Sequence, residues 1–64
     1  MGNRIRAFRK AAGLRQEDLA RELGVTRQTI NAIENNKYDP TLALAMRLAR
    51  LLDQPVEELF LLPK

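Results

Sequence analysis

Residues 16–35 read QEDLARELGVTRQTINAIEN, and this stretch decides the fold. Gly24 divides it into two parts, because glycine readily adopts the left-handed backbone conformation that ends a helix. The apolar residues before Gly24 recur at helical spacing, which predicts a short helix over about residues 16–23. After the glycine, the hydroxyl of Thr26 can cap the free N–H groups of a second helix that extends to about Asn35. Two short helices joined by a tight turn form a helix-turn-helix, whose second helix is typically the recognition helix for DNA.

The recognition helix has two unlike faces. At 100° per residue, Ile30 and Ile33 fall together on one side, which is expected to be buried. The opposite arc carries Arg27, Gln28, Asn31, Ala32 and Asn35. Arginine can donate two hydrogen bonds to guanine, glutamine and asparagine can pair with adenine, and alanine can meet a thymine methyl group. The alternative is an exposed face without a partner, but such faces usually favour Glu and Lys. We therefore predict that the first four residues of this arc read bases.

Polar residues at both ends of the motif predict contacts with the phosphate backbone. Gln16, at the start of the first helix, can donate to a phosphate together with free backbone N–H groups and the helix dipole. Lys37 and the two asparagines before it lie at the far end of the recognition helix, where they could contact phosphates on the neighbouring DNA strand. Arg15 either clamps a phosphate or is simply solvated. The predicted phosphate-binding residues are Arg15, Gln16, Thr26, Asn35, Asn36 and Lys37.

Three more helices are predicted outside the motif. The first ends at Gly13, and its predicted apolar face is formed by Ile5, Phe8 and Ala12. Asn36 suits a left-handed exit from the recognition helix. Thr41 caps a fourth helix, whose predicted apolar face is formed by Leu42, Ala45, Leu48, Ala49 and Leu52. Pro55 is expected at the first position of a fifth, short helix that extends to about Phe60.

The composition limits the possible functions. Sixty-four residues make one domain, near the lower size limit for a chain that folds on its hydrophobic core alone. The sequence contains no Cys, His or Ser, which excludes Ser or Cys nucleophiles, His-based acid–base catalysis and His or Cys zinc sites. We therefore predict a protein that is not an enzyme. No metal, cofactor or small-molecule ligand is expected, since the chain leaves no room for a ligand-sensing domain.

The placement of charge favours a polyanionic partner. Residues 1–37 contain eight basic and four acidic residues, a net charge of +4, whereas residues 38–64 contain three and four, a net charge of −1. The positive half holds the helix-turn-helix, as expected if that half meets DNA; a merely basic, solvated surface is the alternative. The N-terminus lacks a signal peptide, and the apolar run at residues 59–62 is too short to span a bilayer. We therefore expect a soluble cytoplasmic protein with no membrane partner.

Four segments carry a resemblance to a known family: LRQEDLA at 14–20, LGVTRQTI at 23–30, IEN at 33–35 and PTL at 40–42. Together they resemble the Cro/C1-type (XRE) helix-turn-helix family, especially its short stand-alone bacterial repressors, over Ile5 to Phe60. The resemblance implies an all-α, compact five-helix bundle of the lambda repressor type, with an optional short terminal β-strand. It implies a single domain over residues 1–64, with the helix-turn-helix at about 16–35.

The resemblance also implies a function. Such proteins are sequence-specific transcriptional regulators, and usually repressors, that read palindromic operators in double-stranded DNA as homodimers. A bacterial, nucleoid-associated location follows from that activity. Gln16 carries over as the phosphate-binding glutamine, and the family's base-reading positions are occupied by Arg27, Gln28 and Asn31.

A structural ion pair between Arg9 and Glu34 is a further implication of the resemblance. It would tie the first helix to the end of the recognition helix, and Glu34 lies at the edge of the buried stripe, which is compatible. The alternative is a pair of exposed charges worth about 0–1 kcal/mol.

Two positions depart from the family pattern. Arg15 replaces the usual Ser or Thr cap, which is expected to weaken its helix by about 1 kcal/mol, and Asn36 replaces a common glycine.

Four consecutive apolar residues, 59–62, end the last helix. A helix gives such a run no single face, so all four cannot point into one small core. We expect Leu59 and Phe60 to cap the core, and Leu61 and Leu62 to form an exposed patch that packs against its copy in a two-fold dimer. The alternative is a frayed terminus. A second class of function also remains open: an antitoxin-like or adaptor protein that uses the same scaffold to bind another protein.

Overall fold

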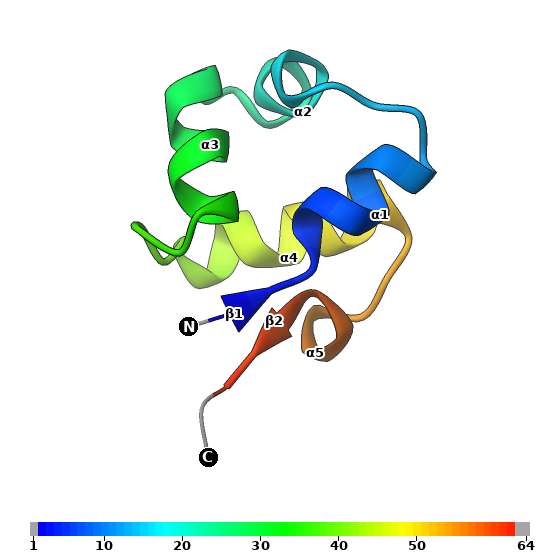
Figure 1. Ribbon diagram of the computed structural model, residues 1–64, viewed down its shortest axis with the longest axis vertical. Helices are drawn as coiled ribbons and strands as arrows, with labels where there is room; N and C mark the ends of the chain where they lie inside the picture. The colour runs from blue at the N-terminus through cyan, green and yellow to red at the C-terminus, as the bar shows by residue number, and fades with distance from the viewer. Residues whose placement is uncertain (1, 63–64) are drawn as a thin grey trace.

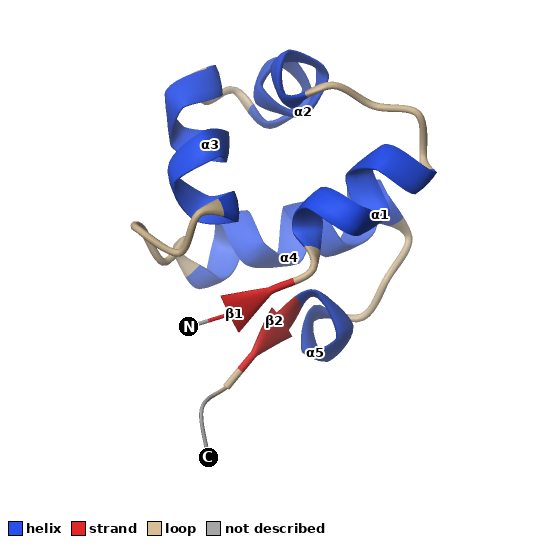
Figure 2. Ribbon diagram, viewed as in Figure 1, coloured by secondary structure: helices blue, strands red, loops and turns tan. Residues whose placement is uncertain are grey.

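The computed structural model describes residues 2–62, which form five helices and two short strands (Figure 1, Figure 2). The helices are α1 (Ile5–Ala11), α2 (Gln16–Leu23), α3 (Arg27–Glu34), α4 (Leu42–Leu52) and α5 (Val56–Leu59). The strands are β1 (Gly2–Asn3) and β2 (Phe60–Leu61). The predicted five-helix fold with a short terminal strand is therefore confirmed. Among the described residues, every helix is too short or too polar to cross a membrane.

Capping hydrogen bonds and left-handed residues set the limits of the helices. The hydroxyls of Thr26 and Thr41 each accept a hydrogen bond from the backbone N–H three residues later, at 3.2 Å, at the starts of α3 and α4. Gly24 ends α2 with a φ of 69°, and Asn36 follows α3 with a φ of 60°. Because each of these exits reverses the chain at once, short helices can pack closely with little connecting loop.

The core is built from aliphatic side chains of all five helices. The largest fully buried side chains are Ile5, Leu19, Ile30, Ile33, Leu48 and Leu59. Burial of one such side chain contributes about 1.5–3 kcal/mol relative to leaving it exposed. Leu48 lies in the middle of α4, the longest helix, which runs behind α1 and α3 in Figure 1. The helices of the motif are therefore held on a common core rather than on each other alone.

The two ends of the described chain meet in a small antiparallel sheet. Gly2 lies opposite Leu61, and Asn3 lies opposite Phe60. The backbone N–H of Arg4 also donates to the carbonyl oxygen of Leu59 at 2.8 Å. Figure 1 shows β1 and β2 at the end of the molecule away from α2. The pairing therefore joins the chain ends at a distance from the turn between α2 and α3.

Two residues assigned to apolar helix faces are exposed instead. Ala12 is exposed because α1 already ends at Ala11, and the second buried position of this helix is Arg9. Leu42 is 72% exposed, because the first turn of α4 extends past the edge of the core. Helical spacing placed both residues on an apolar face, but it does not tell how far the core extends along the helix.

Two helix boundaries also differ slightly from the predicted ones, the end of α3 and the start of α5. α3 ends at Glu34, and Asn35 is its C-terminal cap. α5 begins at Val56, so Pro55 is the residue before the helix and not its first helical position. Phe60 has left the helix for β2, because pairing with β1 supplies its backbone with a partner there.

Candidate nucleic-acid interface

The turn between α2 and α3 fixes the orientation of the recognition helix. Gly24 adopts its left-handed conformation there, and the backbone N–H of Val25 donates to the carbonyl oxygen of Ala20 at 3.0 Å. Ile30 and Ile33 of α3 are each only 1% exposed. Because these two side chains are buried in the core, the opposite face of α3 is turned to solvent.

The predicted base-reading residues do not share one environment. The exposed outer face of α3 carries Arg27, Gln28 and Asn31. Ala32 is half-buried and lines a shallow hollow together with Tyr38 and Leu44. Its methyl group is therefore less accessible to a partner than the three polar side chains.

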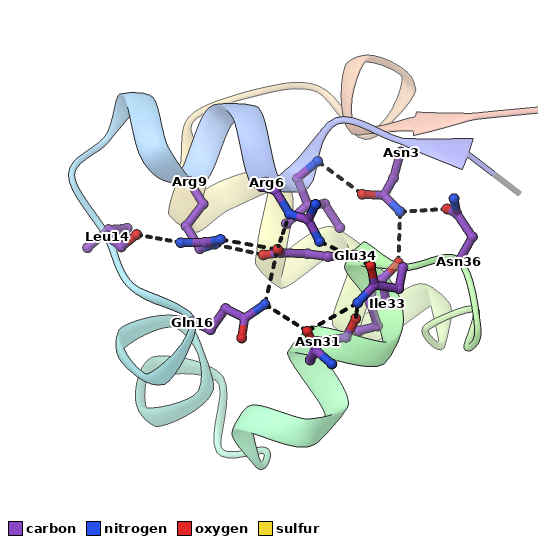
Figure 3. Close-up of polar contacts among 11 residues, drawn as sticks. Asn3, Arg6, Arg9, Leu14, Gln16, Asn31, Ile33, Glu34 and Asn36 are labelled. Atoms are coloured by element: carbon purple, nitrogen blue, oxygen red, sulfur yellow. Dashed lines mark hydrogen bonds and ion pairs between the residues drawn. The ribbon is translucent and has the colours of Figure 1, made fainter.

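A buried carboxylate, that of Glu34, lies at the centre of a polar cluster at the end of α3 (Figure 3). The Glu34 side chain has no exposed surface, and that of Arg9 is 10% exposed. Arg9 Nε donates to Glu34 Oε2 at 2.7 Å, and Arg9 Nη2 donates to Oε1 at 3.1 Å. The same Oε1 accepts from Arg6 Nε and from Gln16 Nε2, both at 3.2 Å. Three helices, α1, α2 and α3, therefore meet on one carboxylate, which we call the Glu34 cluster.

The surroundings of Glu34 favour its ionised form. Desolvation by burial is the largest single influence and raises the pKa of the carboxyl group. Hydrogen bonds from Arg9, Gln16 and Arg6, together with the positive charge of Arg9, act in the opposite direction and hold the pKa below its ordinary value. Arg9 Nη1 also donates to the carbonyl oxygen of Leu14 at 3.0 Å. The Glu34 cluster thus fixes α1 against the C-terminal end of α3 and against the start of α2.

Gln16 connects the Glu34 cluster to the outer face of α3. It is the first residue of α2, and its Nε2 donates to Asn31 Oδ1 at 3.2 Å as well as to Glu34. Asn35 Nδ2 donates to the backbone carbonyl of Asn31 at 2.8 Å and to Asn31 Oδ1 at 3.1 Å. The structure therefore places two predicted phosphate-binding residues in direct contact with a predicted base reader.

Arg15 lies just before α2 and is exposed. Its guanidinium pairs with Glu17 (Nη1–Oε1, 2.8 Å) and with Asp18 (Nε–Oδ2, 3.3 Å). An arginine side chain has no acceptor, so the usual cap is missing, but Asp18 Oδ2 accepts from the Arg15 backbone N–H at 2.8 Å. That backbone hydrogen bond, followed by the one from the Arg15 side chain, holds the pKa of the Asp18 carboxyl below its usual value. Half of a capping box therefore offsets the missing Ser or Thr.

The other predicted phosphate-binding residues lie near the two ends of α3. Thr26 uses its hydroxyl as the cap of α3, and its Oγ1 lies 3.0 Å from that of Thr29. Asn36 Oδ1 accepts from Asn3 Nδ2 at 2.9 Å, so its NH₂ group is the part that faces away from this contact. Lys37 follows and is exposed.

Two residues of this polar region were not selected by sequence reasoning. Arg6 bonds Glu34, and its Nη2 also donates to Asn35 Oδ1 at 3.1 Å. Its spacing of three residues from Arg9 was the available signal, because such residues share a helix face. Asn3 donates through Nδ2 to the carbonyl oxygen of Ile33 at 2.8 Å. No sequence signal marks Asn3, because its position depends on the pairing of β1 with β2.

A second surface lies away from α2 and α3. Leu61 and Leu62 are exposed, by 38% and 82% respectively. They border an apolar groove of about 600 Å³, which is also lined by Pro40, Leu42, Ala45, Val56, Glu57 and Phe60. None of these residues belongs to the helix-turn-helix. The predicted dimer residues and the predicted base readers therefore lie on different parts of the molecule.

The surface around α3 offers exposed hydrogen-bond donors rather than metal ligands. Arg27 and Lys37 are exposed at the two ends of α3, and Arg15 is exposed before α2. Within residues 2–62, no group of three or more acidic side chains is placed to hold a metal ion. The exposed groups can donate hydrogen bonds to an anionic partner that is rich in acceptors.

Known proteins resemble this chain over nearly all of its length. A family model described as helix-turn-helix matches residues 5–59. An uncharacterised HTH-type transcriptional regulator of Methanocaldococcus jannaschii is 48% identical over 61 residues, which cover 95% of this chain and 92% of that protein. The restriction-modification controller protein C.AhdI from Aeromonas hydrophila has a TM-score of 0.80 and 37% identity, with 89% of this chain and 86% of C.AhdI covered. SinR, the master regulator for biofilm formation, in complex with DNA, has a TM-score of 0.76 and 29% identity, with 84% and 87% covered.

These similarities include the parts of the molecule described above. The matched residues 5–59 contain all five helices, α1 to α5, and the Glu34 cluster. The similar proteins are named as regulators, which agrees with the prediction that the chain is not an enzyme. On this sequence and structural evidence, the chain belongs to the XRE-type helix-turn-helix family of transcriptional regulators.

Proposed function

We propose that residues 1–64 act as a single domain that binds a specific sequence in double-stranded DNA, with α3 in the major groove. The observation that carries the proposal is the exposed outer face of α3, formed by Arg27, Gln28 and Asn31. Side chains of these three types can recognise base edges through hydrogen bonds. The Glu34 cluster supports this role, because it holds α3 at a fixed angle to the rest of the domain.

Phosphate contacts would fix the position of the domain on the duplex. Arg15 and Lys37 are exposed at opposite ends of the motif, and Arg15 would exchange its ion pairs with Glu17 and Asp18 for a phosphate. The backbone N–H groups at the start of α2 add further donors. Such contacts set orientation and register, whereas base contacts set sequence preference. The structure of SinR was determined in complex with DNA, and its similarity to this chain supports DNA binding by this chain.

We further propose that the DNA-bound form is a homodimer. Leu62 is 82% exposed at the rim of the apolar groove. In a two-fold dimer the same patch serves both copies, so Leu61 and Leu62 of one copy can cover the groove of the other. Two recognition helices about 34 Å apart, one turn of DNA, would then read a palindromic site.

Repression is the proposed outcome of binding. A dimer that covers two adjacent major grooves would exclude other proteins from the same segment of DNA, including the transcription machinery. The protein would then act at the nucleoid, where its operator lies.

Selection of bound sites from random duplex DNA tests the proposal. The wild type should enrich a palindrome, and Arg27→Ala should lose about 1–3 kcal/mol of binding free energy on that site and little on random DNA. Lys37→Ala should weaken both by a similar amount, as expected for a phosphate contact, because Lys37 is exposed after α3. Arg47→Ala is the matched control, because it removes an exposed arginine from α4, outside the motif. A wild type that enriches no sequence would favour the adaptor function instead.

A further inference from the structure

The hydrogen bonds around Asn31 decide which of its side-chain atoms faces a partner. They start from Glu34, whose ionised carboxylate can only accept hydrogen bonds. Gln16 must therefore turn its NH₂ group towards Glu34, where Nε2 lies 3.2 Å from Oε1. The same Nε2 lies 3.2 Å from Asn31, so the Asn31 atom at this contact must be the oxygen, Oδ1.

A second series of contacts leads to the same orientation. Arg6 can only donate, so the Asn35 atom that lies 3.1 Å from Arg6 Nη2 must be the oxygen. The NH₂ group of Asn35 then faces the Asn31 backbone carbonyl, which can only accept, at 2.8 Å. This NH₂ group also donates to Asn31 Oδ1 at 3.1 Å. Figure 3 shows the oxygen of Asn31 facing Gln16.

The Asn31 oxygen is consequently saturated, since a carbonyl oxygen has two lone pairs and both are in use. Its NH₂ group is the part that remains for a partner at the exposed surface. An asparagine that pairs with adenine needs its oxygen free to accept from N6 while its NH₂ group donates to N7. Asn31 is therefore not arranged for the adenine pairing that its residue type alone suggests.

We propose that Asn31 is a specificity-determining residue that acts only as a hydrogen-bond donor and selects guanine or thymine. Guanine presents two acceptors in the major groove, O6 and N7, and thymine presents O4. Adenine places its N6 amino group beside N7, and cytosine presents an amino group, so both oppose a donor-only side chain. This inference rests on the proposed function, because it names which bases the same surface reads. Gln16 and Asn35 are positioning residues, since they act through Asn31.

Site selection with matched variants tests the base preference. Asn31→Ala should lose about tenfold discrimination at one base pair of each half-site, and the wild type should prefer guanine or thymine on the strand that Asn31 contacts there. Asn31→Asp, which can only accept, should move the preference at that base pair to cytosine. Gln16→Met releases one lone pair of the Asn31 oxygen, so adenine should become tolerated at the same base pair. Gln28→Ala is the control and should change a different base pair.

Two outcomes of the selection would overturn the inference while the proposed function stands. One is a selected A·T base pair at the position that depends on Asn31, where replacing the adenine by purine, which lacks the N6 amino group, weakens wild-type binding, because Asn31 would then accept from adenine N6. The other is an Asn31→Ala variant that selects the same site as the wild type. If the wild type enriches no site at all, the proposed function fails, and the hydrogen-bond polarity is then decided on the free protein.

Nuclear magnetic resonance of the ¹⁵N-labelled free protein supplies that second readout. The side-chain NH₂ protons of Gln16 and Asn35 are engaged and should exchange slowly with water, whereas those of Asn31 should exchange fast. Gln16→Met should leave the exchange of the Asn31 protons fast. Slow exchange at Asn31 together with fast exchange at Gln16 would show the opposite orientation and overturn the inference.

Discussion

Replacing Arg9 with alanine is expected to destabilise the protein far more than replacing its neighbour Lys10. Arg9→Ala removes both hydrogen bonds from Arg9 to Glu34 and the one to the carbonyl of Leu14. The Glu34 carboxylate, whose side chain has no exposed surface, then keeps only Arg6 and Gln16 as donors. Lys10 is exposed on the same helix and serves as the matched control.

The size of the effect follows from the burial of the pair. Removal of one partner from a buried ion pair costs about 3–5 kcal/mol, because the other charge is left uncompensated. Arg6 and Gln16 remain in place, so we expect a loss near the lower limit, about 3 kcal/mol. At roughly 0.05–0.15 kcal/mol per residue, a chain of this length has about 3–10 kcal/mol of stability in all. Arg9→Ala should therefore lower the melting temperature by about 12–24 °C or prevent folding at 37 °C.

Thermal and urea unfolding followed by circular dichroism measure this difference. Lys10→Ala should stay within about 0.5 kcal/mol of the wild type. Arg9→Lys keeps the charge but loses the two-point geometry, and it should fall between the wild type and Arg9→Ala. If Arg9→Ala and Lys10→Ala unfold at the same urea concentration, the Glu34 cluster does not hold α1 in place and the reasoning is refuted.

Three further predictions concern pH, the dimer and the turn. Because the folded-state pKa of Glu34 lies below its ordinary value of 4.5, its contribution to stability is present above that pH and is lost as the pH falls through the folded-state pKa. Unfolding free energies of the wild type and Glu34→Gln should therefore converge below pH 4.5, and a constant gap between them in urea titrations would contradict this. Leu61→Glu/Leu62→Glu should be monomeric by light scattering at micromolar concentration and bind the palindrome more weakly than the wild type; equal affinity and equal mass would rule out this interface. Gly24→Ala should cost about 1 kcal/mol in urea unfolding, because φ is 69° there, whereas Gly2→Ala, outside the left-handed region, should cost less; equal losses would show that the turn is not strained.

The helices of the motif could be predicted from local signals alone. Gly24 and Asn36 both have positive φ values, as their residue types suggest, and Thr26 caps α3 through a bond that spans three residues. The outer face of α3 follows from two buried isoleucines on the opposite side of the helix. Each of these features depends on residues that are close in sequence, so periodicity and capping rules suffice to find them.

The parts that could not be predicted depend on contacts between distant residues. The bond between Asn3 and the carbonyl of Ile33 joins positions thirty residues apart, and it exists only because β1 pairs with β2. Arg6 could have been grouped with Arg9 by its helical spacing, but nothing local indicates that Glu34 has room for both. The exposure of Leu42 also depends on where the core ends, and helical periodicity does not contain that information.

The pairing of β1 with β2 has a consequence for the order of folding. Gly2 and Leu61 are neighbours in space but 59 positions apart in sequence, so their contact closes almost the whole described chain into a loop. Closing a loop of about 60 residues costs roughly 4 kcal/mol of chain entropy at 25 °C. A sheet of two residues per strand recovers little of that cost, whereas α2 and α3 meet through a short local turn. The terminal strands should therefore join last as the protein folds and separate first, and in hydrogen exchange the amide of Arg4 should open well before that of Val25.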